Sequence, residues 1–312
     1  MRKSLQLQAE MTEEFGACVF DVTLDCEDGA PVGGEADHAA MVVALAQSAP
    51  SGARVAVRVH AVDHPAFESD VATIVGQAGH KLCHIMVPKI ESRADVVAAE
   101  NAVNTASGKL HLSQVLPLHV LIESPAAVHR AFEIAAHPRV QSISFGLMDF
   151  VSSHGGAIPA DAMASGFGAS AGRMGQFAHP LVVRAKLEIA SSCHAHGKTP
   201  SHCVVTEFND LEALTSAAKL ASRSFGYSRM WSIHPNQIRP ILEAFAPSEA
   251  EIEYATKIIA ACARVNWAPI SFNGQLHDRA SYRYFWQVLQ RAYRTGRAMP
   301  TEAQVFFSPP LV

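Results

Sequence analysis

The feature that most constrains this chain is a repeated alternation between short apolar runs and longer amphipathic stretches. The runs are rich in Val and Ile and nearly continuous in apolar residues, which is typical of strands buried on both faces of a parallel sheet. Each run is followed by a helical stretch, with a period of about 30 residues, as expected for βα units. The clearest runs cover residues 17–24, 54–59, 83–87, 118–122 and 142–147.

Signals that start a helix occur in the gaps between these runs. They are N-cap residues, prolines suited to a first helical turn, and pairs with capping-box spacing. A glycine at the far end of two of these stretches, Gly197 and Gly296, predicts where the helix stops. The predicted starts are Ser124 with Pro125, Pro180, Asn209 with Glu212, Pro235, Ser248 with Glu251, and Asp278.

Two fold classes satisfy this alternation, a doubly wound sheet and a closed (β/α)₈ TIM barrel. At least seven units are visible, and six apolar runs end in charged or titratable residues. Catalytic groups gather at the carboxyl ends of barrel strands, so this pattern favours the barrel, although strands in general also end in polar residues. We predict a barrel over residues 1–265, with a loop at 151–175 over its mouth. A C-terminal helical extension, or lid, is predicted over 266–312.

Composition excludes several classes of protein. The 312 residues are 49% hydrophobic and 17% charged, which excludes a disordered chain. A net charge of −4 gives no basic field for nucleic acid. No apolar run approaches the roughly 20 residues that span a bilayer, and the amino-terminal segment lacks the apolar core of a signal peptide. We expect a cytoplasmic protein whose six cysteines are free thiols.

Two carboxylates at consecutive strand ends are the first candidates for chemistry. Glu123 and Asp149 are one βα unit apart, since 149 − 123 = 26. Carboxylate oxygens suit a hard divalent cation such as Mg²⁺, which also keeps waters and substrate oxygens. Helix capping or ion pairing is the alternative.

Further charged residues close the first three runs. Asp25, Glu27 and Asp28 follow the first run, where three acids repel one another unless a cation or an arginine lies near. They are candidates to hold metal-bound waters, or else form a solvated turn. Arg58 suits a substrate carboxylate or an enolate oxygen, or an ion pair with those acids. Lys89 has the same options, with the ion pair favoured.

Other motifs give no site. Five residues crowd into one short segment, but their spacing matches no closed zinc pattern, and we expect solvated or capping histidines there. Residues 166–170 lack the lysine and the preceding strand of a phosphate loop, and no Gly-x-Ser-x-Gly elbow is present. The crowded residues are Cys193, His194, His196, His202 and Cys203.

Six short motifs, in this order, resemble one enzyme family. The chain is similar to the HpcH/HpaI aldolase and citrate lyase β-subunit family, nearer its malyl-CoA lyase branch, over roughly residues 15–295. The resemblance implies a (β/α)₈ barrel assembled as a homotrimer or homohexamer. The motifs are Leu24–Asp28, Arg58–His60, Met86–Lys89, Ile122–Ser124, Phe145–Asp149 and Ser232–Gln237.

The resemblance also implies an activity, that of a carbon–carbon lyase with Mg²⁺, or Mn²⁺, on Glu123 and Asp149. It implies metal-bound waters near Glu27 and Asp28. The substrates implied are a 2-oxo or 2-hydroxy acid and a CoA thioester of the malyl, citramalyl or citryl type.

Two catalytic roles follow from the same resemblance. Arg58 would take the substrate carboxylate or the enolate. Residues 274–278 resemble a lid segment that reaches a neighbouring subunit in the malyl-CoA branch. Asp278 is therefore a candidate acid or base acting in trans.

The chain departs from the family pattern in three places. Residues 2–6 match poorly the usual opening strand, which carries an arginine and then Leu-x-x-Pro. Arg229-Met230 stands where Gly-Lys is usual, and the lid segment has Leu276 and His277 for Met and Ile. Two alternatives therefore stay open. One is a CoA-independent, pyruvate-type aldolase, and the other is a non-catalytic barrel that binds a metal or ligand.

Overall fold

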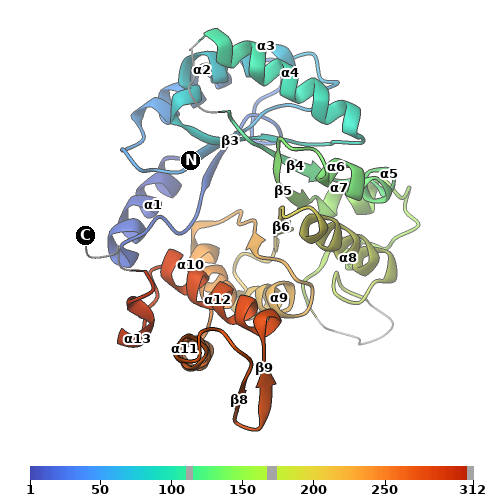
Figure 1. Ribbon diagram of the computed structural model, residues 1–312. Coiled ribbons are helices and arrows are strands. Elements are labelled where there is room, and N and C mark those ends of the chain that lie inside the picture. Colours follow the sequence, from blue (N-terminus) through green and yellow to red (C-terminus); the bar gives the residue numbers. More distant parts are fainter. Residues whose placement is uncertain (110–114, 167–173, 308–312) are drawn as a thin grey trace. The chain divides into compact units, whose positions relative to one another are not determined.

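The computed structural model describes residues 1–109, 115–166 and 174–307 of an α/β protein (Figure 1). Its main sheet has seven parallel strands, hydrogen-bonded in sequence order from first to last. The strands are β1 (Val22–Asp25), β2 (Val55–Arg58), β3 (Leu82–Val87), β4 (Leu118–Ile122), β5 (Val140–Phe145), β6 (Thr199–His202) and β7 (Arg229–Met230).

Helices connect these strands and cover the outer side of the sheet, as α2, α3 and α4 do in Figure 1. The helices of this part are α2 (Glu35–Ser48), α3 (Phe67–Ala78), η1 (Gly79–Lys81), α4 (Arg93–Lys109), α5 (Pro125–His129), α6 (Ala131–Ala135), α7 (Leu147–Ser152), η2 (Ala160–Met163), α8 (Pro180–Ala195), α9 (Leu211–Arg223) and α10 (Pro235–Phe245).

The strand order decides between the two predicted fold classes. A doubly wound sheet reverses its order at a switch point, whereas this order runs straight from β1 to β7. In a flat sheet the edge strands β1 and β7 would be about 29 Å apart, at 4.8 Å per step. Yet Arg229 at the start of β7 is 2.6 Å from Asp21, which precedes β1. The sheet is therefore curled, which is consistent with a TIM-barrel-like fold.

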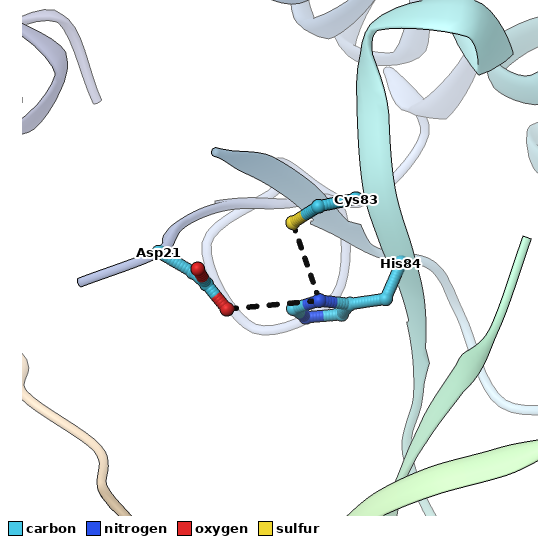
Figure 2. Close-up of side chains that lie close together, drawn as sticks. All are labelled: Asp21, Cys83 and His84. Atoms are coloured by element: carbon cyan, nitrogen blue, oxygen red, sulfur yellow. Dashed lines mark hydrogen bonds and ion pairs between the residues drawn. The ribbon is translucent and has the colours of Figure 1, made fainter. Parts of the chain in front are cut away.

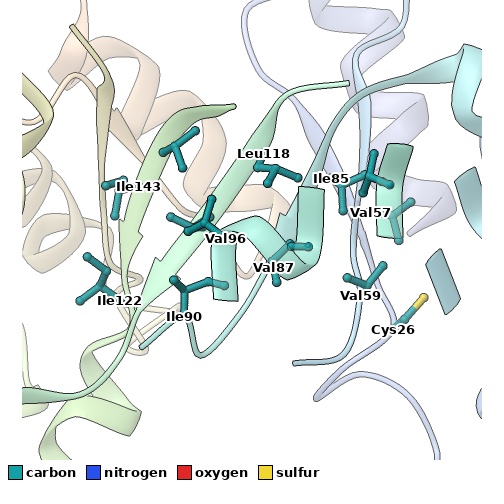
Figure 3. Packing of buried hydrophobic residues seen from close by; sticks show 14 of the residues in the cluster. Cys26, Val57, Val59, Ile85, Val87, Ile90, Val96, Leu118, Ile122 and Ile143 are labelled. Atoms are coloured by element: carbon teal, nitrogen blue, oxygen red, sulfur yellow. The ribbon is translucent and has the colours of Figure 1, made fainter. Parts of the chain in front are cut away.

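The apolar runs form strands buried on both faces, as predicted. Every residue of β2 and of β4 is buried. Figure 3 shows side chains of neighbouring strands, Val57, Val87 and Ile122, in one cluster with Val96 of α4. This cluster holds the helices on the outer side of the sheet.

The helix-start signals are confirmed with one exception. Ser124 accepts a hydrogen bond from the N–H of Ala127, and Ser248 forms the predicted capping box at the start of α11 (Glu249–Arg264). The start of α9 was predicted one residue too early. Its N-cap is Asp210, which accepts from the N–H of Ala213, and not Asn209.

The predicted count of eight barrel strands is not met by the described residues, which contain seven strands in the curled sheet. The opening segment, which matches the family's first strand poorly, forms the helix α1 (Arg2–Phe15). The remaining strands, β8 (Ile270–Phe272) and β9 (Gln275–His277), pair with each other as a separate antiparallel hairpin.

The chain divides into two compact units. One comprises Met1–Leu7 and Phe20–Phe245, and the other Gln8–Val19 and Ala246–Val312. In the second unit α11 packs on α12 (Arg279–Arg294) around Ile259 and Leu289. Its last helix is α13 (Thr301–Gln304). The predicted division at residues 265 and 266, with an extension that packs on a neighbouring subunit, stays a prediction.

Two further expectations concern the loops and the membrane. The predicted loop at 151–175 carries the end of α7 and the short helix η2, and its residues 167–173 lie outside the described part, as does most of the stretch at 166–170. None of the described helices is long and apolar enough to cross a bilayer. The cytoplasmic location stays a prediction.

The ion pairs of Asp21 give the first testable prediction. Burial raises the pKa of Asp21, but Arg229 and Arg54 outweigh it and hold the pKa below its ordinary value. We expect Asp21→Asn to lower the free energy of unfolding by about 1–2 kcal/mol, because both arginines are partly exposed. Since the folded-state pKa is depressed, the difference from wild type should be full at neutral pH and vanish as the pH falls through that pKa. Urea unfolding from pH 7 to pH 3 measures it. Equal stability of Asp21→Asn and of the exposed-loop control Asp63→Asn at pH 7 would contradict the prediction.

Candidate functional site

The candidate site begins with an arginine and an aspartate at the ends of two adjacent strands. Asp25 ends β1 and Arg58 ends β2, and the parallel register places them side by side. Nε and Nη2 of Arg58 each donate to one oxygen of Asp25, both at 2.7 Å. Asp25 also accepts from the N–H groups of Glu27 and Gly29, so the same carboxylate shapes the loop after β1.

The other two acids of this loop also face Arg58. Nη1 of Arg58 is 2.8 Å from Glu27 and 3.2 Å from Asp28. Lys89, after β3, donates to the second oxygen of Glu27 at 2.7 Å. The structure thus brings together four residues that the sequence singled out, and both functional and ion-pair interpretations of Arg58 remain compatible with it.

An aromatic ring covers the guanidinium of Arg58. The indole of Trp231, which directly follows β7, lies 5.1 Å from the Cζ atom of Arg58. Burial lowers the pKa of Arg58, but its bonds to Asp25 and the charges of Glu27 and Asp28 outweigh this and raise the pKa. Arg58 is therefore a permanently charged group, with a side chain only 8% exposed.

Glu123, after β4, is held by backbone. One carboxylate oxygen accepts from the N–H of Lys89 at 2.7 Å. Lys89 has a φ of 51°, a left-handed conformation that a residue with a side chain rarely adopts, and such strain gathers at functional sites. The other carboxylate oxygen lies against Gly146, where a Cβ atom would be 2.3 Å from it. Only glycine leaves room for Glu123 in this position.

Burial raises the pKa of Glu123 to about 7, opposed by the Lys89 N–H and reinforced by the charges of Asp149 and Glu27. Asp149 lies in the first turn of α7 and is exposed. A further cation near Glu123 would favour its ionised form.

The charges of the site do not balance. Five carboxyl groups face two cationic side chains, which leaves an excess of three negative charges when all are ionised. A divalent cation with oxygen ligands would reduce this excess, and a carboxylate pair such as Glu123 and Asp149 is a donor set that Mg²⁺ accepts. The groups counted are Asp25, Glu27, Asp28, Glu123 and Asp149, with Arg58 and Lys89.

Asp278 is described in the second compact unit, where it is the N-cap of α12. Its side chain accepts from the N–H groups of Ala280 and Ser281, and the hydroxyl of Ser281 accepts in return from the N–H of Asp278. This capping box gives Asp278 a structural role. Its predicted part in proton transfer stays a prediction.

A second group of potential metal ligands lies at the opposite ends of the strands (Figure 2). Among the described residues only Asp21, Cys83 and His84 bring one ligand atom each within 4.8 Å of one another, and Glu123, Asp149 and Glu27 form no such group. Asp21 already binds Arg54 and Arg229, and burial together with Arg229 lowers the pKa of His84 to about 4. These arginines make the position unfavourable for a cation.

The sequence predicts that the crowded histidines are solvated or cap a helix, and this prediction is wrong for part of the group. His202 and Cys203 are buried, and Nζ of the buried Lys186 lies 2.8 Å from Nε2 of His202 and 2.6 Å from Gln176. Burial lowers the pKa of both Lys186, to about 8, and His202. A neutral His202 therefore accepts a hydrogen bond from Nζ of Lys186, which also donates to Gln176. This is a structural role, and no zinc group occurs there among the described residues.

Sequence reasoning missed two contributors to the site, Trp231 and Gly146. Asp25 is one of the three loop acids that the sequence offers as ion-pair partners of Arg58, and the structure shows that pair. Trp231 lies one residue before the motif Ser232–Gln237, and no pattern in the sequence singles it out. Gly146 directly follows β5 and precedes Asp149, and a glycine at a strand end is a signal for close approach.

Comparisons with known proteins agree with the motifs. Residues 5–235 match the HpcH/HpaI aldolase/citrate lyase family. An L-malyl-CoA/beta-methylmalyl-CoA lyase from Cereibacter sphaeroides is 30% identical over 294 residues, which is 90% of each chain.

Solved structures are similar as well. The crystal structure of a citrate lyase from Burkholderia xenovorans LB400 is 46% identical, with a TM-score of 0.83 over 98% of this chain and 92% of that chain. Protein CitE from Mycobacterium tuberculosis, in complex with magnesium, acetoacetate and coenzyme A, is 23% identical, with a TM-score of 0.66 over 92% and 95% of the chains. At that identity the likeness shows the fold alone.

The contact between Gly146 and Glu123 generates a prediction. We expect Gly146→Ala to lower the free energy of unfolding by about 1–3 kcal/mol, because the added Cβ forces Glu123 away from its acceptor position beside Lys89. Gly76→Ala, in the interior of α3 with open space around it, should instead raise the free energy by about 0.5–1 kcal/mol. Chemical unfolding of both variants measures the difference. Equal shifts in the two proteins would show that Glu123 has room to move.

Proposed function

This chain belongs to the HpcH/HpaI aldolase/citrate lyase family of carbon–carbon lyases, and we propose that it cleaves a 3-hydroxyacyl thioester of the malyl, citramalyl or citryl type. In the reverse direction it would condense an acyl-CoA with a 2-oxo acid. The observation that carries this proposal is the buried, charged Arg58 within an acid-rich site at the carboxyl ends of the strands. The name of the malyl-CoA lyase from Cereibacter sphaeroides supports the substrate class.

The chemistry of cleavage follows from the charges of the site. A base removes the hydroxyl proton, the carbonyl forms, and the electron pair of the broken C–C bond moves onto the thioester fragment as an enolate. Arg58 stabilises the developing negative charge from a position that is nearly closed to water, where such a charge counts most. Lys89 holds Glu27 and contributes a second positive charge.

The carboxylates have a complementary task. We propose that Glu123 and Asp149 hold Mg²⁺ or Mn²⁺, with waters near Glu27 and Asp28. The bound ion would supply Lewis-acid polarisation of the substrate's 2-oxo or 2-hydroxy group. The raised pKa of Glu123 and the excess of carboxylates support this assignment. The magnesium named with the Mycobacterium tuberculosis relative supports it too.

Asp278 is proposed as the acid or base, acting on the site of a neighbouring subunit in a homotrimer or homohexamer. The support is the resemblance of residues 274–278 to the family's lid segment. The structure gives Asp278 an exposed position and a capping role, and both are compatible with proton transfer.

A CoA-independent, pyruvate-type aldolase is the second candidate. One observation favours it, namely that the opening segment of the chain, which matches the family's opening strand poorly, forms the helix α1. Arg229-Met230 in place of Gly-Lys points the same way. The two candidates differ in whether a thioester is needed.

The first prediction of this proposal concerns the reaction and its metal. Acetyl-CoA and glyoxylate should give malyl-CoA, detected by mass spectrometry, with Mg²⁺ and not with EDTA. Glu123→Gln should lower this activity by about a hundredfold or more with an unchanged circular dichroism spectrum, because the amide is a poorer ligand for a hard cation. Glu68→Gln, on the exposed side of α3, is the matched control. The second candidate would be favoured if pyruvate and an aldehyde gave metal-dependent products and the thioester gave none. Wild-type rates in Glu123→Gln would show that Glu123 is not a metal ligand.

A second prediction separates the two roles of Asp278. Asparagine caps a helix about as well as aspartate but transfers no proton, so Asp278→Asn should keep the melting temperature. Its kcat should fall by about 10²- to 10⁴-fold. Asp278→Ala should lose both the activity and about 1 kcal/mol of stability. If Asp278→Asn turns over at the wild-type rate, Asp278 is a helix cap and nothing more.

A further inference from the structure

The hydrogen bonds of Arg58 leave little for a substrate. A guanidinium has five N–H groups, one on Nε and two on each terminal nitrogen. Asp25 accepts one hydrogen bond from Nε and one from Nη2, and Glu27 and Asp28 form ion pairs with Nη1 at 2.8 and 3.2 Å. Among the described residues, three carboxylates therefore already surround the positive charge that a substrate would use.

A substrate carboxylate needs two parallel N–H groups from the same edge of the guanidinium for a bidentate contact. The edge formed by Nε and Nη2 is occupied by Asp25 at 2.7 Å. The edge formed by Nη1 and Nη2 is the other one, and there Glu27 and Asp28 share Nη1. A substrate can bind this edge only if one of these two carboxylates leaves.

We propose that Asp28 is an internal competitor for the anionic substrate, a carboxylate that occupies Nη1 of Arg58 and is exchanged for the carboxylate of the 2-oxo acid. This inference rests on the proposed function, because it gives Arg58 the substrate. It makes Asp28 a residue that sets the affinity and selectivity for the acid substrate.

Geometry distinguishes Asp28 from Glu27. The side chain of Glu27 is 9% exposed and is held from both sides, by Arg58 at 2.8 Å and by Lys89 at 2.7 Å. The side chain of Asp28 is 71% exposed, and its contact with Nη1 of Arg58 is the longer one, at 3.2 Å. The Asp28 end of this ion pair is open to solvent and the other carboxylates still pair with Arg58, so Asp28 leaves at small cost.

Carboxylate exchange also explains the arrangement around the guanidinium. Asp25 and the ring of Trp231 fix its plane, so the Nη1–Nη2 edge keeps its direction while the partner on it changes. Trp231 also supplies a signal, since an indole 5.1 Å from the guanidinium senses an anion that binds there.

The experiment measures the binding of pyruvate by calorimetry and by tryptophan fluorescence, with EDTA and with Mg²⁺. In EDTA, where chelation by a metal plays no part, Asp28→Asn should bind pyruvate about fivefold more tightly than wild type. Glu35→Gln removes the same charge at the first residue of α2, where its partner is the N–H of Gly33, and should leave the affinity unchanged. If the substrate replaces Asp28 at Arg58, the gain in affinity must also depend on Arg58. The double variant with Asp28→Asn and Arg58→Lys should therefore show no gain. The fluorescence change should be lost in Trp231→Phe.

The outcomes separate this inference from the proposed function. If wild type binds pyruvate with Mg²⁺, but Asp28→Asn and Glu35→Gln have the same affinity in EDTA, Asp28 is not a competitor and the inference fails alone. Asp28→Ala repeats the test with a smaller side chain, and a gain in neither variant overturns the inference. If no variant and no condition gives binding of pyruvate, the 2-oxo acid assignment fails, and the inference fails with it.

Discussion

The curl of the parallel sheet is the constraint on which the rest of the structure depends. It brings Trp231, after the last strand, over the guanidinium of Arg58, which ends the second strand. In a flat sheet these two strands would be about 24 Å apart. Because all seven strands are parallel, the same curl gathers their carboxyl ends at one mouth, where Lys89 and Glu123 also lie. The pair of Asp21 and Arg229 holds the sheet in this form at the opposite ends of its edge strands.

The charged groups within the mouth stabilise one another. The buried charge of Arg58 is tolerated because carboxylates surround it, and those carboxylates exceed the available cations. As a result, burial and the acidic neighbours raise the pKa of Glu123. The excess of carboxylates therefore favours a further cation in the mouth, in agreement with the divalent ion that we propose there.

Local patterns in the sequence predicted the strands, most helix starts and the meeting of Arg58 with Glu27, because these depend on periodicity and on the ends of parallel strands. The predicted eighth strand does not occur among the described residues. The opening segment adopts a helix, and only the whole sheet shows that the edges approach without an eighth strand among the described residues. The roles of Trp231 and Gly146 were not predicted, because each depends on a partner in another part of the chain, Arg58 for Trp231 and Glu123 for Gly146. The burial of His202 depends on Lys186, a charged residue whose fully buried position no local pattern indicates.

The contact between Asp21 and Arg229 also bears on the order in which the molecule is made. These residues are 208 positions apart, whereas each pair of neighbouring strands is consecutive in the chain. During synthesis, β1 to β6 can pair one after another as they emerge, with short loops to close at each step. The two edges can meet only after residue 229 has left the ribosome. A nascent chain that ends before this point already carries Arg58, Lys89 and Glu123, but the edges of its sheet have not yet met. The mouth is therefore completed late in the synthesis of each molecule.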